Sequence, residues 1–217
     1  MKMKTDNGRQ TRAFTLVELL MVISIIGIIA SLTVVGIASA RGKKEEAAVK
    51  AQHAQLVLAI EDYKKQFGAY PPDNAIVTSN NAAWNPLAYE LGGVRRSGAN
   101  FISELDPAHT ITTAGPAQLN AYFGLQGFVN VTSGSKAKSF ITASGSGKNS
   151  TFVYLTNGTP GLPAVMLLQV PAEHPNGGIN VWRYRAYPVG GHNPKTYDLW
   201  AEWKRRGGGT NVHGNWK

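Results

Sequence analysis

A long apolar segment near the N-terminus limits most strongly what this chain can fold into. From Leu19 to Ala40 the sequence contains no charged residue. As a helix rising about 1.5 Å per residue, this run spans roughly 33 Å, which is enough to cross a bilayer. Four basic residues precede it, namely Lys2, Lys4, Arg9 and Arg12. The segment therefore predicts a membrane helix whose N-terminus stays in the cytoplasm while the rest of the chain is exported.

Three kinds of N-terminal segment fit an apolar run of this kind. A secretory signal would be cut after the small residues Ala38-Ser39-Ala40, but the run is about twice as long as the usual signal core of roughly 7–15 residues. A plain signal anchor has no use for the carboxylate of Glu18, because a charge within a bilayer is costly. A prepilin-type segment, the third alternative, would use it.

Cleavage between Ala13 and Phe14 would give Glu18 a partner. The new α-amino group of Phe14 would be positive and would lie close to this carboxylate, so that the two charges attract. Between neighbouring helices the same pair would set their axial register.

The segment "FTLVELLMVISIIGIIASL", which follows the basic residues and Ala13, resembles the processing and assembly segment of type IV prepilins and type II secretion pseudopilins. The resemblance implies that a membrane aspartyl peptidase removes residues 1–13 and N-methylates Phe14. It also implies that Glu18 neutralises the amine of a neighbouring subunit. The family usually has glycine where Ala13 stands, and many members have proline where Val35 stands.

An amphipathic helix is predicted to continue this segment as far as Phe67. No proline occurs between Lys43 and Phe67, and one face carries apolar residues at helical spacing: Val49, Leu56, Ile60, Tyr63 and Phe67. Gly68 can adopt the left-handed cap conformation, and Pro71 and Pro72 cannot continue a helix.

Two stretches, one at each end of the region beyond the membrane segment, resemble one particular subunit of this superfamily. "AIEDYKKQFGAYP" (59–71) looks like the end of the helix in the major pseudopilin of type II secretion. "TYDLWAEWKRRGGGTNVHGNW" (196–216) resembles the last strand, glycine-rich loop and terminal G-N-W of that subunit. The disulfide that closes the C-terminal loop of many pilus subunits cannot form here, because the chain has no cysteine.

The rest of the chain predicts a small antiparallel sheet and a long insertion. β-branched and aromatic runs bounded by turn residues predict strands at 151–156, 164–170, 179–187 and 196–203. Short helices are predicted at 86–91 and 117–125, and the Ser/Gly/Lys-rich stretch 132–150 predicts a mobile surface loop.

The expected fold class is α+β and pilin-like: a long N-terminal helix, hydrophobic in its first half, packed against a small C-terminal antiparallel sheet with a long αβ-loop insertion. The expected divisions are a cleaved leader (1–13), a transmembrane and filament-core half-helix (14–40), an amphipathic half-helix (41–67), the insertion (68–150), and the sheet with its C-terminal loop (151–217).

The resemblance also implies a calcium site in the terminal loop. Calcium prefers six to eight oxygen ligands, usually including carboxylates. The loop offers Leu199, Glu202, Thr210 and Asn211, with one carboxylate among them. Lys204, Arg205 and Arg206 stand between these candidates and disfavour a divalent cation. Calcium is the one cofactor that the resemblance implies.

The sequence contains no complete match to the catalytic or phosphate-binding motifs that its short stretches suggest. "GSGKNS" (145–150) lacks the first glycine of a phosphate loop and has Asn149 in place of its Ser/Thr. The five histidines form no metal-binding spacing, and the chain is predicted not to be an enzyme.

A basic stretch near the C-terminus contributes to the net charge of +9. Basic residues interleaved with aromatic ones could hold phosphates and stack bases. The favoured alternative is a solvated strand face over an aromatic core, and nucleic acid is the least favoured partner. The candidate residues are Arg183, Arg185, Lys204, Arg205 and Arg206.

The predicted function is that of a structural subunit of a periplasmic pseudopilus, assembled from subunits stored in the inner membrane to drive protein export. The alternatives are a type IV pilus subunit for adhesion or motility and a minor-pilin-like DNA-binding module. The resemblance implies as partners further copies of the chain in a helical filament, the prepilin peptidase, the assembly platform, minor pseudopilins and, before assembly, membrane lipid. It implies a single-pass inner-membrane location with a periplasmic head, and a periplasmic or extracellular filament after assembly.

Overall fold

The computed structural model describes residues 14–76, 82–111, 115–156, 158, 160–205 and 207–216. The predicted leader, 1–13, therefore lies outside the described residues. The chain divides into two compact units, Met1–Lys43 and Lys44–Lys217, and each is considered by itself.

One helix, α1 (Leu16–Phe67), contains most of the described part of the first unit and the start of the second. In the first unit the side chains of residues 14–31 are all exposed, including a dense series of large apolar groups such as Leu20, Ile25 and Ile29. Within the described part of the chain, no helix combines the length and apolar character needed to cross a membrane.

In the second unit, the apolar face predicted for α1 is confirmed. Val49, Leu56, Ile60 and Tyr63 are buried in the main core. The predicted end of the helix is also confirmed: Gly68 has φ +80°, and its N–H donates to the Lys64 carbonyl at 2.8 Å, as a left-handed cap requires.

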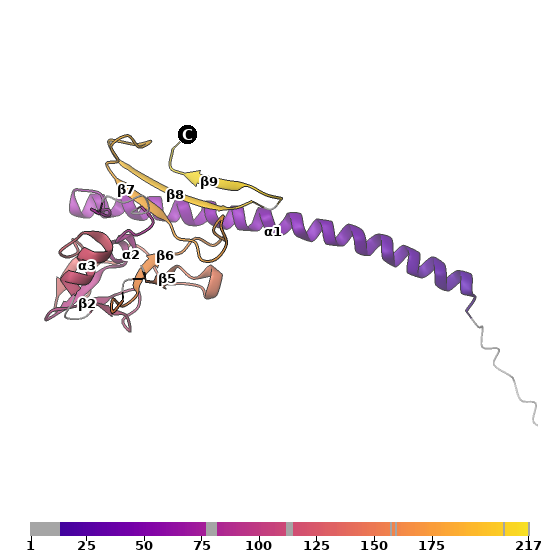
Figure 1. Ribbon diagram of the computed structural model, residues 1–217, viewed down its shortest axis with the longest axis horizontal. Coiled ribbons are helices and arrows are strands. Elements are labelled where there is room, and N and C mark those ends of the chain that lie inside the picture. The colour runs from indigo at the N-terminus through magenta and orange to yellow at the C-terminus, as the bar shows by residue number, and fades with distance from the viewer. Residues whose placement is uncertain are drawn as a thin grey trace, which may run out of the picture. The chain divides into compact units, whose positions relative to one another are not determined.

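A three-stranded antiparallel sheet lies alongside the second-unit part of α1 (Figure 1). Its order is β7 (Arg183–Ala186), β8 (Tyr197–Lys204), β9 (Thr210–Gly214). Side chains alternate along β8, so that Leu199, Ala201 and Trp203 are buried in the core, while Trp200 and Glu202 on the other face are partly exposed.

A second pair of strands is joined to this sheet. β5 (Phe152–Leu155) and β6 (Val165–Leu168) pair antiparallel, and an isolated bridge connects Gln169 to Val181 just before β7. Every residue of β6 is buried, which explains its continuous apolar sequence. All four predicted strands thus occur at their expected places.

The insertion contains a sheet that the sequence analysis did not predict. Two short helices, α2 (Leu87–Gly92) and α3 (Gly115–Phe123), match the expected positions. Between and after them, four strands of two to four residues form the order β3-β2-β1-β4, with β1 and β4 parallel. These strands are β1 (Val94–Ser97), β2 (Asn100–Ser103), β3 (Thr110–Ile111) and β4 (Val131–Ser133).

The stretch 132–150 differs from the mobile loop that its composition predicts. It includes the end of β4 and a 3-10 turn, η1 (Gly147–Asn149). Phe140 packs against Tyr63 and Phe67 of α1, with ring centroids 5.6 and 6.2 Å away. Because two aromatic side chains of the helix hold Phe140, this part of the stretch is part of the packed head. The fold as a whole is α+β and pilin-like, as expected.

Candidate functional site

Glu18 belongs to a capping box at the start of α1. Thr15 precedes the helix, and its hydroxyl oxygen accepts the Glu18 backbone N–H at 3.2 Å. In return, Glu18 Oε2 accepts the Thr15 backbone N–H at 2.9 Å and the Thr15 hydroxyl at 2.8 Å. This reciprocal pattern satisfies helix N–H groups that would otherwise have no acceptor.

The sequence analysis missed this second role of Glu18, although its signal is local. Thr15-Leu-Val-Glu18 is the T-x-x-E pattern that marks a helix start. The described hydrogen bonds of the Glu18 carboxylate all use Oε2, and a carboxylate can accept about four bonds in all. Glu18 can therefore cap its own helix and still accept from an amine of another subunit. Phe14 is exposed beside it, and Ala13 lies outside the described residues.

Asn215 holds the C-terminal residues against β8 with both its side chain and its backbone. Asn215 Oδ1 accepts the Leu199 N–H at 2.9 Å, and Asn215 Nδ2 donates to the Tyr197 carbonyl at 2.8 Å. The Asn215 N–H also donates to the Leu199 carbonyl at 3.2 Å. The side chain thus continues the ladder at the point where β9 ends.

The other two residues of the terminal G-N-W have matching roles. The Trp216 ring stacks on His192 with centroids 4.0 Å apart and planes 7° apart, and it also meets Trp200 edge-on. A Cβ at Gly214 would come within 2.6 Å of the Trp216 ring, so only glycine lets the ring fold back. These contacts close the C-terminal loop without a disulfide.

A buried carboxylate organises the neighbouring β7–β8 connection. Asp198 is 4% exposed. It accepts the His192 N–H at 2.8 Å, and the Asn193 N–H and side-chain amide each at 2.9 Å. Sequence analysis did not select Asp198, since a single aspartate in a strand gives no signal before its donors are placed.

The four calcium candidates do not converge on one face of the β8–β9 hairpin. Glu202 and Thr210 share one face, whereas Leu199 and Asn211 lie on the other, because partners across an antiparallel pair point the same way. Glu202 Oε1 lies 3.8 Å from the Arg183 Nε and 3.2 Å from the Trp200 indole nitrogen that donates to it. Calcium binding here stays a prediction.

The structure brings some of the predicted basic residues together on one face of the sheet. Arg183 and Arg185 lie on the outer face of β7, opposite the buried Trp182 and Tyr184. Trp203 is also buried, so these three aromatic side chains belong to the core, whereas Trp200 on the outer face is partly exposed. Lys204 and Arg205 are exposed at the hairpin turn, and Arg206 lies outside the described residues.

Two histidines form a contact between α1 and β9. His53 is 8% exposed; its Nε2 lies 3.4 Å from the Leu199 carbonyl, and its ring centroid is 4.6 Å from that of His213. Burial lowers the pKa of His53, and His213 lowers it further. Burial also lowers the pKa of His213, with Lys50 acting in the same direction and Glu46 in the opposite one.

We expect acid to weaken the packing of β9 on α1. When the folded-state pKa lies below the unfolded value of about 6.5, the unfolded state binds more protons, so stability falls as the pH drops below that value. The wild-type melting temperature should fall by a few degrees between pH 7.5 and 5.0. Replacing His53 by Gln should remove part of this dependence, measured by near-ultraviolet circular dichroism of the full-length chain in detergent.

The matched control is Gln55→Ala, which removes an exposed, non-titratable side chain from the same helix. It should leave the pH dependence as in the wild type. An unchanged pH profile in His53→Gln would contradict the assignment.

Comparison with known proteins gave one match. Residues 8–38 match the family model for the prokaryotic N-terminal methylation motif, which covers the capping box and most of the exposed apolar segment. Neither the curated proteins nor the solved structures contained a match to the chain. The match identifies a prepilin-type methylation motif at the N-terminus of the chain.

Proposed function

We propose that this chain is the structural subunit of a type II secretion-like pseudopilus, a filament that drives protein export. The observation that carries the proposal is the methylation motif at residues 8–38 at the start of a helix whose apolar side chains are exposed from Leu16 to Ile29. A soluble protein rarely exposes so large an apolar surface without a partner to cover it. In this proposal lipid covers the surface before assembly, and neighbouring copies cover it in the filament.

Assembly would rest on the charge of Glu18. Subunits stored in the inner membrane, with their heads in the periplasm, would leave it when this carboxylate meets the amine of Phe14 on a subunit already in the fibre. The capping hydrogen bonds to Oε2 hold the Glu18 side chain at the helix start, where an incoming amine can reach it. The assembly platform and minor pseudopilins would start and guide this process, which turns over no substrate.

The secretion assignment is preferred over a pilus for adhesion or motility because of the C-terminal end of the head. The terminal Gly214-Asn215-Trp216 closes the last loop through the Asn215 ladder and the Trp216 stack, where many pilus subunits use a disulfide. In a bacterial strain, loss of the gene should abolish export of secreted enzymes and leave twitching motility intact. The reverse result would favour the pilus.

Processing gives a direct prediction about the mature N-terminus. We expect the chain recovered from membranes to begin at Phe14 and to carry one methyl group on its α-amine. Intact-mass measurement with N-terminal sequencing checks this. A chain beginning at Arg41 would indicate a secretory signal, and a chain beginning at Met1 would indicate an anchor.

A further inference from the structure

An open groove of about 650 Å³ lies between α1 and the stretch 139–151, within the second unit. Its lining combines apolar residues, among them Ala51, Leu58 and Phe140, with neutral polar ones. Asp62 is the one charged residue that lines the groove in the described part of the chain. Leu58 is 67% exposed, so a leucine of the amphipathic half-helix faces solvent here instead of the core of its own head.

The wall of the groove opposite α1 has a fixed shape. The Thr151 N–H donates to the Ser144 carbonyl at 3.0 Å, and the Ser144 N–H donates to the Thr151 hydroxyl oxygen at 2.9 Å. Gly145 has φ +76°, and a Cβ there would clash with the Asn149 carbonyl, so only glycine allows this turn. Phe140 anchors the other end of the wall on α1. The groove is therefore formed before any partner binds.

The connection between β7 and β8 presents apolar side chains to solvent at residues 187–191, named the tip here. Val189 is 100% exposed and Tyr187 is 48% exposed. A valine side chain stabilises a structure when it is removed from water, and nothing in the described part of the head covers Val189. The tip therefore offers an apolar side chain that its own head does not use.

Hydrogen bonds hold the backbone of the tip. The Gly191 N–H donates to the Pro188 carbonyl at 3.0 Å, and the Tyr187 N–H donates to the Thr196 carbonyl at 2.7 Å. The buried Asp198 carboxylate fixes the two residues that follow the tip. Tyr187 has φ +47°, which is uncommon for an aromatic residue. Backbone strain of this kind occurs most often where a structure positions a functional group.

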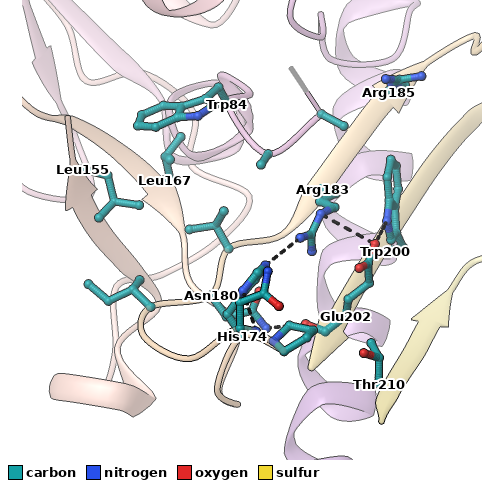
Figure 2. Close-up of a pocket in the computed structure, with 16 residues that line it drawn as sticks. Trp84, Leu155, Leu167, His174, Asn180, Arg183, Arg185, Trp200, Glu202 and Thr210 are labelled. Atoms are coloured by element: carbon teal, nitrogen blue, oxygen red, sulfur yellow. Dashed lines mark hydrogen bonds and ion pairs between the residues drawn. The ribbon is translucent and has the colours of Figure 1, made fainter. Parts of the chain in front are cut away.

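The two strands that carry the tip are also joined on their outer face. Figure 2 shows Arg183 of β7 beside Glu202 of β8, with Arg183 Nε 3.8 Å from Glu202 Oε1. Arg183 Nη2 lies 3.2 Å from His174 Nε2, so these side chains interact with one another. Because the tip and its strands are held in place, a partner can bind the tip with little loss of conformational freedom.

A second copy of this chain is the partner that fits both surfaces. The β7–β8 connection and β5, which directly follows the groove wall, lie on opposite sides of α1 (Figure 1), so the tip of one head does not fill its own groove. Beside the tip Lys195 is exposed, and the charged residue of the groove is Asp62, whose exposed pairing with Lys65 is weak. Opposite charges across an interface favour the correct orientation.

We infer that the tip of one copy inserts Val189 into the groove of the next copy, against Leu58. The inference rests on the proposed function, because a filament needs a contact that repeats from copy to copy. Each head offers one tip and one groove on different parts of its surface, so the contact is heterologous. A heterologous contact that does not close into a ring continues as a helical filament.

The chain contains no cysteine, which allows a direct test by cross-linking. A full-length chain with both Val189→Cys and Leu58→Cys, expressed in place of the wild type and treated with a short bismaleimide, should give dimers, trimers and larger species on a denaturing gel. A mixture of the two single variants should stop at dimers, because each chain then has one half of the contact. Both side chains are exposed, so the replacements leave the core intact.

The matched control combines Val189→Cys with Val129→Cys, since Val129 is an exposed apolar residue outside the groove. It should give at least tenfold less cross-linked product. Absence of the ladder from the Val189→Cys and Leu58→Cys chain, an equal ladder from the control, or cross-linking to a different protein would overturn the inference. Filament yield and export, measured in the same cells, test the proposed function separately. Filaments without a ladder would reject only this contact, and a ladder without export would reject only the secretion assignment.

Discussion

Glu18→Gln should reduce filament assembly by at least about a hundredfold, because it removes the charge that would recruit the incoming amine in a site shielded from water. Glutamine is accepted at this position of a capping box, so the helix start should be preserved. The measurement is the yield of sheared filaments from a strain that expresses only the variant, compared with equal amounts of membrane-stored subunit.

Thr15→Ala provides the matched control, since it removes the capping partner and keeps the charge. If charge pairing controls assembly, Thr15→Ala should assemble within a few fold of the wild type. If capping is the essential role of Glu18, the order reverses: Glu18→Gln assembles and Thr15→Ala does not. That reversal would remove the electrostatic mechanism while leaving the prepilin-type processing untouched.

Glu90→Ala should destabilise the head by about 3–5 kcal/mol, the cost of leaving several buried donors without a charged acceptor. Glu90 is fully buried on α2. Its Oε1 accepts the Val129 N–H at 2.9 Å, and its Oε2 accepts the Asn130 N–H at 2.9 Å and the Tyr63 hydroxyl at 2.8 Å. The carboxylate therefore joins α1, α2 and the strand-forming part of the insertion.

In a chain of this size, such a loss should lower the melting temperature by roughly 10 °C, measured by near-ultraviolet circular dichroism. Glu46→Ala is the control, because Glu46 is an exposed glutamate of α1 paired with Lys50, and it should melt close to the wild type. A shift below about 2 °C for Glu90→Ala would show that these hydrogen bonds do not hold the insertion.

The pH dependence of Glu90 has the opposite sign to that of His53. Burial raises the pKa of Glu90, although its hydrogen bonds oppose this. The folded state then binds the proton more tightly than the unfolded state, so this group adds stability as the pH falls from neutral toward its unfolded value near 4.3. Glu90→Gln should lose this contribution.

Several features of the fold could be predicted because their signals are local. The core face of α1 follows from apolar residues at helical spacing, and its end follows from Gly68 and the prolines. The strands β5 to β8 follow from compact β-branched and aromatic runs. The capping role of Glu18 has an equally local signal, the T-x-x-E pattern that begins at Thr15.

The insertion sheet could not be predicted in this way. Its strands are two to four residues long, too short for alternation to be visible, and Arg95 and Arg96 make β1 look like a surface loop. It forms because a distant part of the chain pairs with it. The Val94 N–H donates to the carbonyl of Asn130 at 3.0 Å, and these two residues lie far apart in the sequence.

By itself the sequence determined the apolar N-terminal segment, the length of the helix and the face that it buries, since each depends on residues within a few turns of one another. The tertiary structure alone decided which polar side chains became buried and what they hold. Glu90 meets Asn130 across 40 residues, and Trp182 donates to Gln52 across 130. The hydrogen bonds of a carboxylate or an amide depend on which donors lie beside it. Here those donors come from distant parts of the sequence, and only the folded chain places them next to these groups.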